Sequence, residues 1–261
     1  MYTPIQPYHL LSKEYQKKIK YTETIIPELS DVLVYMWEEE YHLGETDTAI
    51  DIVVPDGCIN LVVSVEDKII TWGGISKSEF DMECPVSGKY IGFSFKPGAF
   101  WALTGAPTPV VMDVMIPIEK IDNSFDTASF FELSYEEMKR FLIDYFVQLA
   151  KNIKTMEYIQ LFDRIHTNHI PNTEELYEFI KLSPRQIQRQ FKKHYGLTPQ
   201  LILSIIKFQY CVAELLYERS ERASLISNYY DQSKFINEFK KNLGLTPVQF
   251  VNLNQMRKTS F

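Results

Sequence analysis

The chain has 261 residues, 45% hydrophobic and 23% charged, a balance that excludes wholesale disorder and fits one large domain or two ordinary ones. It has no apolar run of membrane-spanning length, and its N-terminus lacks the features of a signal peptide, so we expect a cytoplasmic protein without membrane contact. Its three cysteines form no CxxC pair and are expected to be buried thiols.

The charge is unevenly distributed along the chain. Residues 1–154 contain 13 basic and 24 acidic side chains, a net charge of −11. Residues 155–261 contain 14 basic and 10 acidic side chains, a net charge of +4. The total of −7 argues against a protein that simply coats nucleic acid, and the asymmetry predicts two domains with different partners.

The first part of the chain is predicted to be rich in β-strands. Two β-branched runs, Ile50–Val54 and Ile59–Val65, flank a turn at Pro55–Gly57. A further strand is expected within Lys89–Gly98, where small or polar residues alternate with Ile91, Phe93 and Phe95. Short strands separated by turns indicate a small barrel or sandwich.

The period changes to a helical one at Ser134. Apolar residues recur at helical spacing from there to about residue 150, and Ser134 with Glu137 forms a capping-box start. This helix either closes the core of the first domain or forms a dimer seam. We place the domain boundary by this change of period: a β-rich sensor or oligomerisation domain at 1–150, and an all-α domain at 155–261.

One phrase occurs twice in the helical part: "FKKHYGLTP" at 191–199 and "FKKNLGLTP" at 239–247, 48 residues later. In each copy a capping residue, Ser183 or Asp231, starts a helix that a glycine ends, and Thr-Pro starts the next helix. The pattern predicts helices at 173–180, 184–194 and 199–218. It therefore predicts two helix-turn-helix units, about 173–195 and 221–243, joined by the helix at 199–218.

The helix at 184–194 carries basic and amide side chains and no acid. Its apolar positions Ile187 and Phe191 are expected to face inward. The exposed candidates for reading bases are then Arg185, Gln186, Gln188 and Arg189, since Arg recognises guanine and Gln recognises adenine in the major groove. The candidates for phosphate contacts are Lys192 and Lys193, although a lysine pair is also compatible with a simple solvated surface.

The segments "LSPRQIQRQFKKHYGLTP" and "DQSKFINEFKKNLGLTP" resemble the two helix-turn-helix units of AraC/XylS-type bacterial transcription regulators. The resemblance covers roughly 173–251. It implies sequence-specific binding of double-stranded DNA, with base readers at the positions of Arg185, Gln188 and Arg189. A small-molecule effector, RNA polymerase and a second copy of the chain are further candidate partners. A protein-interaction scaffold is the alternative reading of the repeat.

The second unit departs from the family pattern. Its DNA-facing candidates are Ser233, Lys234, Ile236, Asn237, Lys240 and Lys241. The family usually has Arg at the position of Asn237, and the glycine of the preceding turn is replaced, with Asn228 as its counterpart. We therefore expect the first unit to carry most of the sequence reading.

The segments "VPDGCINLVVSV" and "YIGFSFKPGAFWALTGAP" resemble a cupin-like sensor domain of unassigned ligand. Four aromatic residues are candidates for a ligand pocket in it, with plain core as the alternative: Trp72, Phe93, Phe95 and Trp101. Asp56 is expected to be a turn residue, and no base for catalysis is near Cys58 in sequence.

The five histidines form no metal-ligand pattern. We therefore predict no enzymatic activity, no cofactor and no metal. Two alternatives stay open. In one, the N-terminal domain is a small-molecule-binding or enzymatic module with the helical domain as a regulatory appendage. In the other, a protein partner or promoter geometry controls the chain without a small effector.

Overall fold

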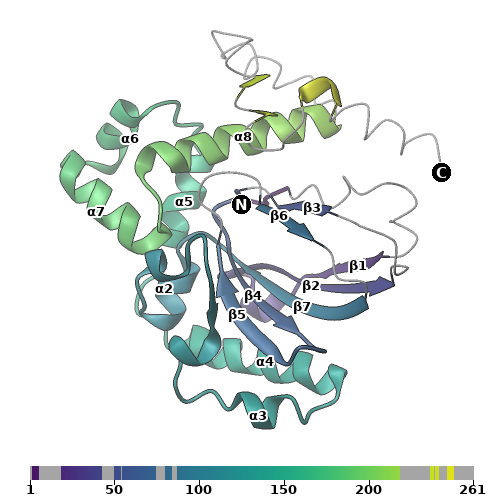
Figure 1. Ribbon diagram of the computed structural model, residues 1–261. Coiled ribbons are helices and arrows are strands. Elements are labelled where there is room, and N and C mark those ends of the chain that lie inside the picture. Colours follow the sequence, from purple (N-terminus) through teal and green to yellow (C-terminus); the bar gives the residue numbers. More distant parts are fainter. Residues whose placement is uncertain are drawn as a thin grey trace.

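The computed structural model describes most of the first 217 residues and a few short segments after them. The described residues are 2–5, 19–42, 50–53, 55–74, 80–83, 87–217, 236–237, 239–240 and 246–249. Strands occupy the first part, and helices occupy the rest (Figure 1). The predicted α+β architecture, β-rich first and helical afterwards, is confirmed. The cupin-like barrel stays a prediction.

Two antiparallel sheets form the first part. Six strands pair in the order β1-β2-β7-β4-β5-β8, and β3 pairs with β6 in a separate ladder. The strands are β1 (Ile19–Thr24), β2 (Leu33–His42), β3 (Ile50–Val53), β4 (Ile59–Ser64), β5 (Ile69–Gly73), β6 (Phe80–Glu83), β7 (Ser87–Phe95) and β8 (Met115–Pro117). The predicted turn between β3 and β4 is present: Gly57 has φ +80°, and the Asp56 carboxylate accepts a hydrogen bond from the Cys58 amide at 2.8 Å.

Helices follow the sheet and also interrupt it. The α-helices are α2 (Ala99–Thr104), α3 (Thr127–Phe130), α4 (Tyr135–Lys151), α5 (Glu157–Thr167), α6 (Thr173–Ile180), α7 (Pro184–Tyr195) and α8 (Pro199–Tyr217), and the 3₁₀ turns are η1 (Pro27–Leu29), η2 (Thr108–Val111) and η3 (Ile118–Lys120). The helices expected at 173–180, 184–194 and 199–218 are confirmed to within one residue at each end. Short α2 follows β7 directly through the turn at Pro97 and Gly98.

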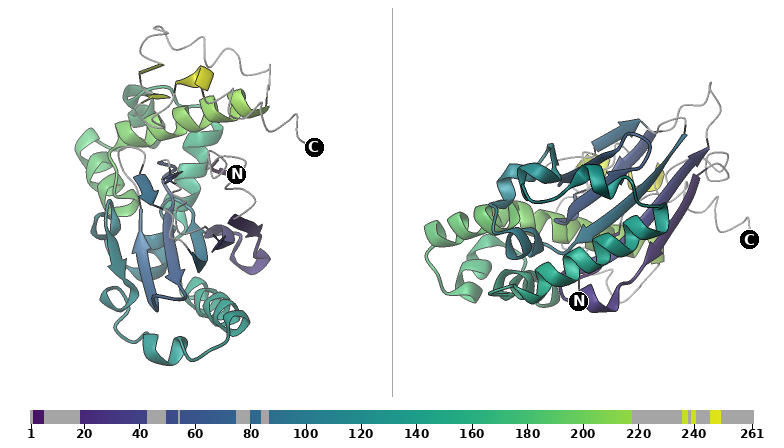
Figure 2. Two further views of the ribbon diagram at one scale, coloured as in Figure 1. Left: turned by 45° about the vertical axis from the view of Figure 1, so that its right-hand side comes forward. Right: turned by 90° about the horizontal axis from the view of Figure 1, so that it is seen from below.

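The apolar face of the six-stranded sheet packs on α4. Directly opposite residues of antiparallel strands point to the same face, which places Phe93 with Leu61 and Met36. Their face is buried and contacts Phe146 of α4. In Figures 1 and 2, α4 crosses this side of the sheet, while β3 and β6 lie on the other. The buried residues of α4 are Met138, Leu142 and Phe146. The packing therefore favours the interpretation in which this helix closes the core of the first domain over the one in which it forms a dimer seam.

One hydrophobic core runs from the sheet into the helices. We call the chain through α4 the sheet part and the chain from α5 onward the helical part. Buried residues of both belong to the same cluster, from Leu61 and Phe95 to Phe162, Phe191 and Ile202. The described N-terminal residues also join the two parts: the Tyr2 amide donates to Asp163 of α5 at 2.8 Å, and the Ile5 amide donates to Gln209 of α8 at 2.7 Å.

The side chain of Gln209 in α8 is buried and makes hydrogen bonds to two distant parts of the chain. It is only 4% exposed. Besides accepting from the Ile5 amide, its side-chain nitrogen donates to the carbonyls of Ile5 at 3.3 Å and Pro55 at 3.5 Å. A buried amide that makes such bonds avoids a desolvation penalty and fixes its neighbours in place. α8 is thereby held to the turn that precedes β4.

Candidate nucleic-acid interface

The first helix-turn-helix unit is formed by α6 and α7, and each boundary has a local cause. The Asn172 side chain caps α6 by accepting from the Glu175 amide at 2.9 Å. Lys181 ends α6 in the left-handed conformation. Ser183 then starts α7 with a capping box that includes Gln186, and Pro184 occupies the first turn. Gly196 ends α7 with φ +71°, as the sequence predicts.

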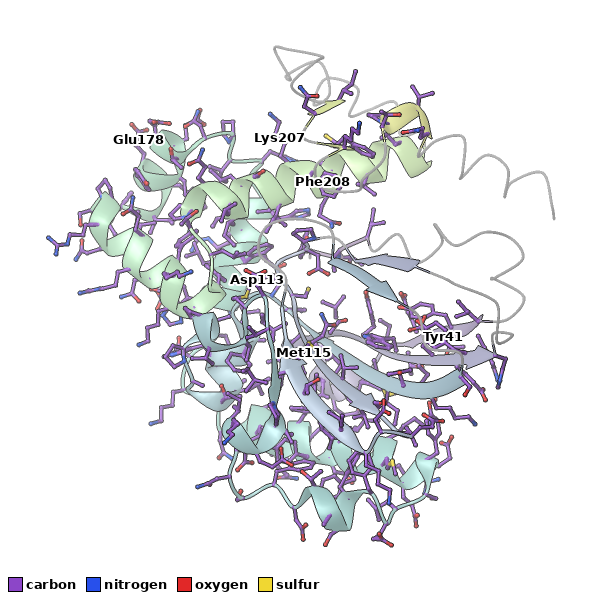
Figure 3. All side chains as sticks on the ribbon, in the orientation of Figure 1. Tyr41, Asp113, Met115, Glu178, Lys207 and Phe208 are labelled. Atoms are coloured by element: carbon purple, nitrogen blue, oxygen red, sulfur yellow. The ribbon has the colours of Figure 1, made fainter. Side chains whose placement is uncertain are left out.

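α7 has one buried face and one basic face. Ile187, Phe191, His194 and Tyr195 are buried. Every predicted DNA-contacting side chain of this helix is exposed: Arg185, Gln186, Gln188, Arg189, Lys192 and Lys193. Figure 3 shows nitrogen-tipped side chains projecting outward from α7, away from the rest of the molecule. The helix thus presents exposed Arg and Gln side chains, as a recognition helix does when it enters the major groove of DNA.

Two of these side chains have a local partner. The Gln186 carboxamide oxygen accepts from the Ser183 amide at 3.1 Å, so it closes the capping box. The Lys192 ammonium donates to the Gly196 carbonyl at 2.9 Å, at the end of its own helix. Arg185, Gln188 and Arg189 are therefore the stronger candidates for reading bases, and the local bond of Gln186 was not predicted from the sequence.

Lys193 has a partner from the sheet part. Its ammonium lies 4.8 Å from the centre of the Trp101 ring, over the ring face. The same ring is edge-on to His194, with 4.2 Å between ring centres. Trp101 thus touches two consecutive residues in the last turn of α7.

The second unit is described at only a few positions. Ile236, Asn237 and Lys240 are exposed, as expected for DNA-facing side chains, whereas Ser233, Lys234 and Lys241 lie outside the described residues. Phe239 is buried like its counterpart Phe191, and its ring lies 5.6 Å from that of Phe208 on α8.

The Thr-Pro start of the following helix is the same in both copies. The Thr198 hydroxyl accepts from the Leu201 amide at 3.3 Å, and the Thr246 hydroxyl accepts from the Gln249 amide at 3.3 Å. The capping chemistry predicted from the repeat is confirmed at both threonines.

The four aromatic candidates for a ligand pocket do not lie together. Trp72, Phe93 and Phe95 are at most 1% exposed and contact Phe146 of α4, with ring centres 5.8, 5.4 and 4.7 Å away. These are the contacts of the core alternative. Trp101 lies apart from the other three, on α2 against α7.

The opposite face of the sheet carries polar and aromatic residues that the sequence analysis missed. Strand register places Tyr35 and Trp37 of β2 on it, opposite Ser94 and Gly92 of β7. The Ser94 hydroxyl donates to Asn60 at 2.6 Å. A β-carbon on Gly92 would lie 1.8 Å from the Trp37 ring, so only glycine leaves room for the indole.

We call this surface the polar-aromatic face. Its buried members on β2 are Tyr35, Trp37, Glu39 and Tyr41. Burial, followed by the Asp56 carboxylate, raises the pKa of Tyr35, so its hydroxyl stays protonated. Alternation along "YMWEEEY" is the signal that could have found these residues.

Among the residues that the structure describes, no group of three or more His, Cys, Asp or Glu side chains is arranged to hold a metal ion. No helix within the same residues has the length and apolar character needed to cross a membrane.

Two family models match the chain. A helix-turn-helix domain matches residues 176–252, and a domain of unknown function, DUF6597, matches residues 26–117. No curated protein matches significantly. Among solved structures, ToxT from Vibrio cholerae is similar to 90% of this chain over 98% of its own length, at 12% identity and a TM-score of 0.42. Another ToxT structure, bound to an unsaturated fatty acid, is similar to 90% of this chain over 94% of its own, at 10% identity and a TM-score of 0.35.

Proposed function

We propose that this chain, whose residues 176–252 match a helix-turn-helix domain, is a DNA-binding transcription regulator of the AraC type in which the sheet part controls how the two units engage DNA. The observation that carries the proposal is the construction of α7. Its buried face anchors it in a core shared with the sheet part, and its exposed face carries Arg185, Gln188 and Arg189.

We infer that both recognition helices enter successive major grooves on one side of the DNA, about 34 Å apart. α8 joins the two units and has 19 residues, which corresponds to a rod of about 28 Å at the usual rise per residue. A continuous helix of that length fixes the separation of the units instead of letting it vary. Arg185, Gln188 and Arg189 read bases in the first groove, and Asn237 with Ile236 contributes less in the second.

The experiment is a gel shift on promoter fragments, including the region upstream of the protein's own gene. We expect a specific complex that survives competitor DNA and weakens as salt rises, because phosphate contacts release counterions. The double variant Arg185→Ala with Arg189→Ala should lose the specific complex but keep its fold. Glu178→Ala, an exposed residue of neighbouring α6, serves as the matched control. The absence of any salt-sensitive specific complex would overturn the proposal.

We propose further that the sheet part responds to a small-molecule effector. Support comes from the polar-aromatic face, where Trp37, Glu39 and Tyr41 are buried on one strand and the Ser94 hydroxyl of the neighbouring strand donates to Asn60. Binding sites combine apolar surface with a few placed polar groups in this way. Thermal-shift screening of metabolites on the wild type and on Trp37→Leu tests it: a ligand that stabilises only the wild type supports the effector.

The non-enzymatic reading, a cytoplasmic location and contacts with RNA polymerase or a second copy remain part of this proposal. The enzymatic alternative for the sheet part predicts turnover of the compound that stabilises it, which product analysis after incubation detects. Control by a protein partner predicts no stabilising small molecule at all. These outcomes separate the three modes of control.

A further inference from the structure

We propose that Trp101 is a positioning residue for DNA binding: its ring holds the Lys193 ammonium beside the reading face of α7, so that the sheet part completes the DNA-contacting surface. This inference rests on the proposed function. Trp101 lies within the domain of unknown function, and Lys193 lies within the helix-turn-helix domain. The contact between them is therefore a direct link between the two domains at the site of DNA binding.

The direction of the Trp101 side chain is set by how α2 packs. Gly98 caps α2 in the left-handed conformation, and Ala99, Phe100 and Leu103 of the helix are buried. Trp101 lies between these core positions and is half-buried, so one side of its ring is available to α7. A β-carbon on Gly98 would lie 3.2 Å from both the Tyr158 backbone and the Tyr195 ring, which shows how closely α2 approaches the helical part.

The last turn of α7 is held in place by contacts with α5 and η2. The His194 ring stacks on the Tyr158 ring at 3.5 Å with an angle of 9° between the planes. The Thr108 hydroxyl donates to the His194 carbonyl at 2.8 Å, and the Tyr195 hydroxyl donates to the Tyr158 carbonyl at 2.6 Å. Because these bonds fix the backbone at His194, the position of the adjacent Lys193 relative to Trp101 is fixed as well.

The two lysines of the pair are used differently. The Lys192 ammonium donates to the end of its own helix, whereas the Lys193 ammonium rests on a ring supplied by the sheet part. A ring face attracts the ammonium without occupying its hydrogen-bond donors, so Lys193 keeps its donors for a phosphate oxygen. The ring also restricts the side chain to fewer rotamers before DNA arrives, which lowers the entropy cost of the contact.

The test measures the salt dependence of DNA affinity on the fragment that gives the specific complex. Lys193→Ala should reduce the slope of log K against log salt by about 0.9, the value for one phosphate contact. Trp101→Leu keeps apolar volume against His194 but removes the ring face. It should weaken binding by about two- to fivefold at low salt and lower the slope in the same direction as Lys193→Ala. Trp101→Phe, which retains a ring face, should recover most of both.

Double variants separate positioning from general damage. Trp101→Leu should add nothing to the slope change of Lys193→Ala, yet it should add fully to Arg189→Ala, whose side chain does not contact the ring. Thermal melting of each variant checks the fold, and Trp101→Phe supplies the same comparison if Trp101→Leu melts early. If the wild type forms a specific complex and both Trp101 variants show the same salt slope as the wild type, the positioning role alone is overturned. The absence of a specific wild-type complex overturns the proposed function, and this inference with it.

Discussion

Gly196 and Met112 meet across the junction of the sheet and helical parts: a β-carbon on Gly196 would lie 2.4 Å from the Met112 γ-carbon. Gly196 also has φ +71°. The glycine that ends α7 therefore serves two purposes, since it permits the left-handed turn and lets the helix end approach η2 closely.

Gly196→Ala should lower the free energy of unfolding by about 2–4 kcal/mol, because backbone strain at positive φ adds to the steric clash of the new methyl group with the Met112 γ-carbon. Gly105→Ala is a matched control. Gly105 has the same φ of +71°, but a β-carbon added there would meet no atom within 4 Å. It should cost only about 1 kcal/mol. Urea unfolding of both variants measures the difference, and equal losses would contradict the close-approach argument.

Truncating Phe146 distinguishes a filled core from a ligand pocket beneath α4. The ring is fully buried and touches Trp72, Phe93 and Phe95. If these rings form a close-packed core, Phe146→Ala should cost about 3–5 kcal/mol in the free energy of unfolding. Phe141→Ala on the same helix, 43% exposed, should cost about 1 kcal/mol. A loss at Phe146 no larger than that at Phe141 would favour the pocket.

Stability is expected to fall in acid partly because of His194. Burial, followed by the nearby Lys193 charge, lowers the pKa of His194 to about 4. Since the folded pKa lies below the unfolded value near 6.5, protons favour the unfolded chain. The stabilisation that depends on neutral His194 is fully present above pH 6.5, and it is lost progressively as the pH falls towards 4. Urea unfolding at pH 7.5, 6 and 5 follows it.

His194→Phe is the control for this pH dependence, because it keeps a flat ring against Tyr158 without a titrating group. Subtracting its pH profile from that of the wild type removes the contribution of the carboxylates. The difference should decline between pH 6.5 and pH 4. A flat difference would show that His194 titrates alike in both states.

The two recognition helices should contribute unequally to DNA binding. Arg189→Ala should weaken specific binding by about 1–3 kcal/mol, because it removes a side chain able to contact guanine at two atoms. Asn237→Ala should weaken it less. Both side chains are exposed, so neither change should lower the melting temperature appreciably. Fluorescence anisotropy on the specific fragment measures both. A larger loss at Asn237 would reverse the ranking of the two units.

The helices of the first unit were predictable because short-range chemistry marks their ends. Ser183, Pro184 and Gly196 each act within a few residues of their own position, so the sequence alone locates α7. The exposed side of α7 follows from the spacing of Ile187 and Phe191 in the same way. The bond between Gln186 and Ser183 follows a short-range rule too, since a Gln three residues after a capping Ser completes a capping box.

The two faces of the sheet could not be told apart from one strand. In β7, Phe93 and Phe95 alternate with Gly92 and Ser94, a pattern that fits plain core as well as a ligand pocket. Their contacts are with α4, a helix about 50 residues later in the chain, and only tertiary structure decides that pairing. Trp101 shows the same limit: it follows a Pro-Gly turn, and the direction of its side chain depends on where α2 packs.

The bonds of Gln209 bear on how such a protein could be recombined. The Gln209 carboxamide on α8 bonds Pro55, in the turn between β3 and β4, and Ile5 near the start of the chain, and an unrelated neighbour would not supply these partners. A chimera that grafts this helix-turn-helix part onto another sensor would bury that amide unpaired. Productive exchange would have to carry the N-terminal residues and the turn at Pro55 along with the helices, so the two parts of the chain would be inherited together.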